Sequence, residues 1–156
     1  MSASARSKRP ETLSRLRRSD RVVAVIATII APVLVWLLAT VGFGQQLYSP
    51  GFGGTAPQEL SIWLVAASAG IAALAGAGVL AVIERISRRP AQVWLVVSTA
   101  VLILSLGAPL SGEGIGTADK LALVSMHLAA GAVMIPLLYR SARLRQEENQ
   151  SGTKPH

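Results

Sequence analysis

Four long apolar runs constrain this chain more than any other feature of its sequence. They cover residues 22–41, 60–83, 91–110 and 121–138. At about 1.5 Å of helical rise per residue, each run is long enough to cross a hydrocarbon layer about 30 Å thick. Only helices and closed barrels satisfy their backbone hydrogen bonds in lipid, and the alternating polarity of a barrel strand is absent here. The runs therefore predict an all-α fold, an integral membrane bundle of four transmembrane helices.

The basic residues are sorted by the connections between these runs. All 15 lysines and arginines except Lys120 precede the first run, separate the second from the third, or follow the fourth. The positive-inside rule then predicts a multi-pass protein of the cytoplasmic membrane with both termini cytoplasmic, N-in and C-in. The net charge of +7 is accordingly assigned to anionic lipid headgroups and not to nucleic acid. The arginines expected to contact anionic lipid are Arg15, Arg17, Arg18, Arg88, Arg89 and Arg143.

Composition supports the same class of protein. Hydrophobic residues make up 51% of the chain, more than a soluble core of this size needs. The absence of cysteine excludes disulfides, thiolate metal sites and iron–sulfur clusters.

Three segments are expected along the chain. Residues 1–20 form a basic cytoplasmic segment, which is disordered or forms an interfacial helix, and residues 21–140 form the transmembrane domain. Residues 141–156 form a disordered cytoplasmic tail. The first apolar run is longer than the core of a signal peptide, so it is expected to remain as an uncleaved span.

The second run is rich in small residues, which let helix backbones approach closely in lipid. The residues expected to pack against other helices are Ala69, Ala73, Gly76 and Ala77. Because small residues occur all around this helix, it is predicted to lie at the centre of the bundle.

His127 is an ionisable residue within the fourth run and is the candidate intramembrane polar site. On a helical wheel it shares a face with Gly131, which leaves room for a neighbouring helix. The ring is therefore expected to face protein and to form an interhelical hydrogen bond. The candidate partners are Thr28, Ser68 and Ser98.

Other roles for His127 lack the residues they need. A metal site needs three or four ligands, and no other His, Cys, Asp or Glu lies within the four runs. No acid, base and nucleophile set can be assembled from the spans, so no catalytic, metal or cofactor-binding residue is assigned and the protein is predicted not to be an enzyme.

Three segments carry a resemblance to a known family. They read ERISRRPAQVW, LILSLGAPLSG and MHLAAGAVMIPLLYR. In them the chain resembles the uncharacterised four-span membrane proteins grouped as domain of unknown function 6069, found mainly in actinobacteria. The resemblance runs from about Arg21 to Arg140 and is most specific at residues 127–136. It implies an integral membrane protein of the cell envelope and transfers no catalytic residue.

The sequence leaves three functions open. The first is a non-enzymatic scaffold or accessory subunit that packs, through small-residue faces of its second and fourth helices, against another copy or another membrane protein. The second is a small transporter or channel in which His127 is a polar gate, although intramembrane carboxylates are missing. The third and weakest is a redox subunit with haem held at His127.

Overall fold

The structure is a computed structural model that describes the backbone of residues 3–50 and 56–152, and the side chains of residues 19–50 and 56–147. Helices dominate the described chain, joined at one place by a small strand pair. In chain order the elements are α1 (Ala3–Leu37), η1 (Leu38–Gly42), β1 (Tyr48–Ser49), β2 (Gln58–Glu59), α2 (Ile62–Ile86), α3 (Pro90–Ser105), α4 (Gly107–Ser111) and α5 (Thr117–Gly152).

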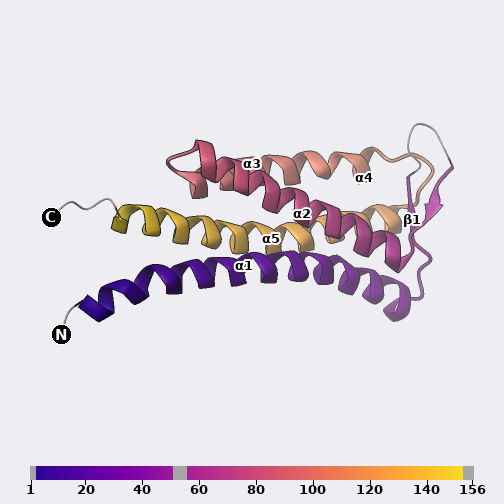
Figure 1. Ribbon diagram of the computed structural model, residues 1–156. Helices are drawn as coiled ribbons and strands as arrows, with labels where there is room; N and C mark the ends of the chain where they lie inside the picture. The colour runs from indigo at the N-terminus through magenta and orange to yellow at the C-terminus, as the bar shows by residue number, and fades with distance from the viewer. Residues whose placement is uncertain (1–2, 51–55, 153–156) are drawn as a thin grey trace.

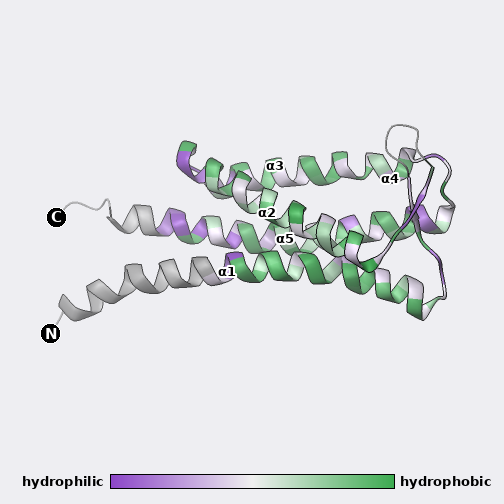
Figure 2. Ribbon diagram, turned by 45° about the vertical axis from the view of Figure 1, so that its right-hand side comes forward, coloured by the Kyte–Doolittle hydropathy of each residue, from purple (hydrophilic) through white to green (hydrophobic). Residues whose placement is uncertain are grey.

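Four helical segments of the structure are long and apolar enough to cross a membrane. They are Ser19–Gly42, Ile62–Ile86, Pro90–Ser111 and Thr117–Glu147. Each contains or closely matches one of the four predicted runs, and Figure 2 shows the hydrophobic residues along the middle of the bundle. The prediction of an all-α bundle with four membrane-crossing helices is confirmed.

The helices run lengthwise, with both termini at one end of the bundle (Figure 1). We call this the terminal end; it also holds the turn between α2 and α3. The opposite end, with β1, β2 and α4, we call the strand end. Here β1 and β2 pair antiparallel, with Tyr48 opposite Glu59 and Ser49 opposite Gln58.

The central helix is α5, and not α2 as predicted. The most extensive contact in the bundle joins α1 to α5, and α5 packs on α3 as well, whereas α2 lies mainly against α1. The small residues of α2 explain the difference because they are divided between two faces. Ala69 and Ala73 are buried, but Ala72 and Ala75 are exposed, so α2 approaches its neighbours closely on one side only.

Both end segments are helical where the sequence leaves room for disorder. α1 is continuous from Ala3, so most of the predicted basic segment 1–20 belongs to the same helix as the first span. α5 likewise continues to Gly152, through most of the predicted tail 141–156. Ser141 and Ala142 are fully buried against the neighbouring helices, and this tertiary burial extends the helix beyond the apolar run.

Two clusters of buried side chains form the interior. The cluster near the terminal end contains Ala24, Leu80, Ile83, Ala91, Trp94, Leu138 and Ala142. The cluster near the strand end contains Leu47, Leu60, Val65 and Met126. The first cluster joins α1, α2, α3 and α5, and it lies next to the charged residues of the terminal end.

Candidate functional site

His127, the candidate polar site, bonds within its own helix. Its Nδ1 lies 2.8 Å from the carbonyl oxygen of Leu123, one turn earlier in α5. Because a carbonyl oxygen can only accept, Nδ1 is the donor in this hydrogen bond. The ring is half-buried, so it lies at the margin of the interior.

The three predicted partners of His127 also bond to their own helices. The Thr28 hydroxyl donates to Ala24 O at 2.6 Å, and that of Ser98 to Trp94 O at 2.7 Å. The hydroxyl of Ser68 donates to Val65 O at 3.0 Å. The interhelical bond expected for His127 is thus replaced by bonds within α1, α2, α3 and α5. Hydroxyl groups inside a helix commonly adopt this local bond to the preceding turn.

At Gly131, a side chain of α3 and not a neighbouring backbone lies in close contact with α5. A Cβ atom added at Gly131 would lie 2.7 Å from Cδ2 of Leu102 in α3. That distance is shorter than any ordinary carbon–carbon contact. Gly131 therefore fixes how α3 packs on α5, one turn from His127.

The predicted packing residues of α2 lie on one face of that helix. Ala69 and Ala73 are 8% and 1% exposed, and Gly76 and Ala77 are half-buried. A Cβ at Gly76 would lie 2.9 Å from Sδ of Met134 and 3.5 Å from the ring of Trp94. The Trp94 indole in turn donates to Ile135 O across the α3–α5 contact at 3.2 Å.

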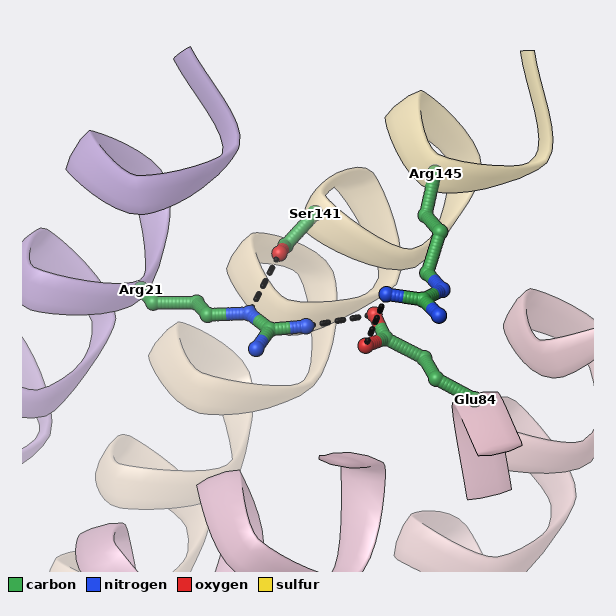
Figure 3. Close-up of polar contacts among 4 residues, drawn as sticks. All are labelled: Arg21, Glu84, Ser141 and Arg145. Carbon is green, nitrogen blue, oxygen red and sulfur yellow. Dashed lines mark hydrogen bonds and ion pairs between the residues drawn. The ribbon is translucent and has the colours of Figure 1, made fainter. Parts of the chain in front are cut away.

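A buried carboxylate at the terminal end joins three helices (Figure 3). Glu84, in the last turn of α2, has a side chain only 2% exposed. Its Oε1 accepts from Arg21 Nη2 of α1 at 2.5 Å, and its Oε2 lies 3.8 Å from Arg145 Nη1 of α5. Arg21 Nε also donates to the buried Ser141 hydroxyl at 3.0 Å. We call these four residues the ion cluster.

Sequence reasoning assigned no role to the ion cluster because it treated Glu84 as a residue at the end of a span. The charge pattern of the sequence could have indicated this cluster. The charge pattern places residues 21, 84 and 140–145 at one membrane face, and Glu84 is the acidic residue that ends the second run there. A carboxylate among so many arginines at one level predicts pairing, although not which arginine it pairs with.

The predicted lipid-contacting arginines fall into two groups. The side chains of Arg15, Arg17 and Arg18 lie outside the described residues. Arg88, Arg89 and Arg143 come together at the terminal end, where a cleft of about 430 Å³ opens between the α2–α3 turn and α5. Its lining consists of Arg88, Arg89, Ala91, Gln92, Tyr139, Arg143 and Gln146. We call it the basic cleft.

The described side chains bring no three His, Cys, Asp or Glu residues together in a metal-binding group. Another acidic side chain with a structural role is Asp119, at the strand end. Its two oxygens accept from the backbone N–H groups of Tyr48 and Gly116, both at 2.9 Å. These two bonds hold the start of β1 and the start of α5 together.

The fold and these contacts define a class of protein, a four-helix membrane bundle whose arginines gather at the end that holds both termini. Within that class, the sequence matches the family described as "Family of unknown function (DUF6069)" over residues 12–144. The match covers most of the chain, and the protein belongs to this family. Comparisons with curated proteins and with solved structures give no match.

Proposed function

We propose that this protein is a non-enzymatic scaffold or accessory subunit of the cytoplasmic membrane, oriented with its terminal end at the cytoplasmic face. In this role it associates laterally with another membrane protein or with a second copy of itself. The charge sorting of the sequence supports the orientation, because positive residues are retained on the cytoplasmic side during insertion.

The observation that carries the proposal is how the polar groups within the spans are used. Thr28, Ser68, Ser98 and His127 each bond to a carbonyl of their own helix. Local bonds of this kind support a structural role over a transport path, which transporters build from facing ionisable side chains. The contacts at Gly76 and Gly131 are those of a fixed, closely packed bundle.

The outer face of α2 also carries large aliphatic residues, such as Ile71 at 70% and Leu74 at 65% exposed, but small residues between them favour lateral association through this helix. The exposed face of α3 carries large aliphatic residues, such as Val96 at 70% and Leu104 at 77% exposed, as expected for contact with lipid chains. On α2, Ala75 and Gly78 are exposed one turn apart, and a Cβ added at Gly78 would meet no atom within 4 Å. Small residues on an open face suit the close approach of another helix.

Crosslinking in native membranes tests this proposal, and the absence of natural cysteine makes single-cysteine variants direct. Ala75→Cys, carrying a photoreactive maleimide reagent, is expected to give one protein adduct of defined mass. The adduct should disappear when Gly78→Leu fills the same face. Val96→Cys, equally open to lipid on α3, is the matched control and should give no such adduct.

Two results would overturn the proposal. One is the same outcome from Ala75→Cys and Val96→Cys, whether both give adducts or neither does, since α2 would then be no different from a lipid-facing helix. The other is a transport or haem-binding activity that depends on His127. A proton or cation flux in proteoliposomes that His127→Ala abolishes would make the protein a transporter, and a Soret band that the same change removes would make it a haem protein.

A further inference from the structure

We propose that the basic cleft is a binding site for one anionic phospholipid, which it recognises by the phosphate group. The cleft lies where the turn between α2 and α3 faces the end of the fourth span, and it is large enough for a headgroup at about 430 Å³. The site is separate from the outer face of α2, so it does not depend on the lateral association proposed above.

The first argument is that most of the positive charge in the cleft has no carboxylate partner among the described side chains. Among the described side chains, no carboxylate lies within ion-pair distance of Arg88 or Arg89. Arg143 has one acidic partner, Glu147, at 3.9 Å, and both of these side chains are more than half exposed. The neighbouring ion cluster is the opposite case, because Glu84 there pairs with both Arg21 and Arg145. The basic cleft thus concentrates positive charge that an anion can neutralise.

The second argument is that the donors in the cleft suit a phosphate group. Guanidinium groups present paired N–H donors that match two phosphate oxygens. The side chains of Gln92, Gln146 and Tyr139 add neutral donors in the same lining. Ala91 and Gln92 belong to the first turn of α3, a 16-residue helix whose positive dipole end also favours an anion. Each of these features increases the preference for phosphate over an uncharged headgroup.

The third argument identifies the source of the phosphate as a lipid. The cleft begins at the level where the membrane-crossing segment Pro90–Ser111 begins. The surface of α3 beside and below Gln92 is aliphatic: Val93, the next residue, is 38% exposed, and Val96, one turn deeper, is 70% exposed. A phospholipid in the cleft would place its phosphate among the arginines and lay its acyl chains on this surface, whereas free phosphate would use only the charged part. Basic pockets of this kind at the ends of spans are typical sites for anionic headgroups.

The test uses the purified full-length chain in detergent, with phosphatidylglycerol as the probe and native mass spectrometry to count the lipid molecules bound. One retained phosphatidylglycerol is expected, and Arg88→Gln, Arg89→Gln or Arg143→Gln should each weaken its binding about fivefold, the effect of losing one charge near the headgroup. Arg85→Gln is the charge-matched control, because Arg85 is exposed in the last turn of α2 and does not line the cleft. It should change binding less than about twofold.

Three outcomes would overturn the proposal. Equal weakening by Arg85→Gln would show that overall charge, and not the cleft, holds the lipid. Equal retention of phosphatidylcholine would show that the site does not select an anionic headgroup. Displacement of the lipid by millimolar inorganic phosphate would identify a site for a soluble anion. Unfolding temperatures of all four variants in detergent, expected to match that of the unmodified chain, show whether the fold is intact.

Discussion

The two ends of this bundle hold their polar groups in different ways. At the terminal end, the ion cluster links side chains of three helices, with the carboxylate of Glu84 almost fully buried between two arginines. At the strand end, the carboxylate of Asp119 has no ion-pair partner among the described side chains and instead accepts from the backbone N–H groups of Tyr48 in β1 and Gly116 before α5. One carboxylate therefore fixes how helices are arranged, and the other fixes the path of a connection.

The difference has a physical origin in what each end must satisfy. The terminal end carries many arginines, and their charges repel unless an acid or an anion lies between them. The strand end carries a chain that leaves α1, forms β1 and β2, and returns into α2, so its unpaired backbone groups need acceptors. A carboxylate serves both needs, but its removal should be felt by the whole bundle in one case and locally in the other.

The largest effect is expected from Glu84→Gln. This change leaves Arg21 and Arg145 without their countercharge and turns an amide donor toward guanidinium donors. Breaking a buried ion pair costs about 3–5 kcal/mol. Arg21 and Arg145 are 27% and 33% exposed and recover some hydration, so we expect a loss of about 2–3 kcal/mol in the free energy of unfolding. Denaturant unfolding in detergent micelles, followed by tryptophan fluorescence, measures this loss.

Glu113→Gln is the control for that substitution, because Glu113 is exposed at the strand end. It should leave the unfolding free energy unchanged within about 0.5 kcal/mol. A Glu84→Gln variant as stable as this control would show that the ion cluster does not hold α1, α2 and α5 together.

A smaller and more local effect is expected from Asp119→Asn. The amide keeps one acceptor oxygen, so one of the two N–H groups, of Tyr48 or Gly116, loses its partner. Hydrogen bonds to a charged group contribute about 1.5–3 kcal/mol each, and the retained oxygen offsets part of this, so we expect a loss of about 1–2 kcal/mol. Amide hydrogen exchange should increase at Tyr48 and Gly116 and stay unchanged around Glu84. Increased exchange at both ends would contradict the proposed independence of the two ends.

Residue position in the sequence predicted the level of each charged side chain along the bundle, but not its partner. Level follows from counting residues along a helix, so the runs and the sorted arginines were sufficient to place Arg88, Arg89 and Arg143 at one end. Partner choice depends on how each helix is rotated about its axis. That rotation is set by side-chain packing between helices, which one sequence does not display.

The packing contacts show why the rotation was not predictable. Gly131 receives the side chain of Leu102, and Gly76 receives those of Met134 and Trp94. Each contact joins residues far apart in sequence, and each depends on the shape of both partners. The small residues of α2 were visible in the sequence, and Gly76 among them makes a close contact. Which helix lies at the centre depended on pairings between helices that the sequence does not show. The hydrogen bond of His127 was predicted to join two helices, and that prediction was wrong because the rotation of each helix about its axis was not known from the sequence.

The smallest effect is expected from Glu147→Gln, which makes the same chemical change at the same end as Glu84→Gln. Glu147 lies 3.9 Å from Arg143, and the two side chains are 54% and 59% exposed. Exposed ion pairs contribute about 0–1 kcal/mol, because water screens the charges and two long side chains must be ordered. We expect the unfolding free energy to change by less than about 0.5 kcal/mol in the same denaturant measurement. If Glu147→Gln proves as costly as Glu84→Gln, burial between two arginines is not what makes Glu84 important. The proposed difference between a buried carboxylate that joins helices and an exposed one at the same end would then be wrong.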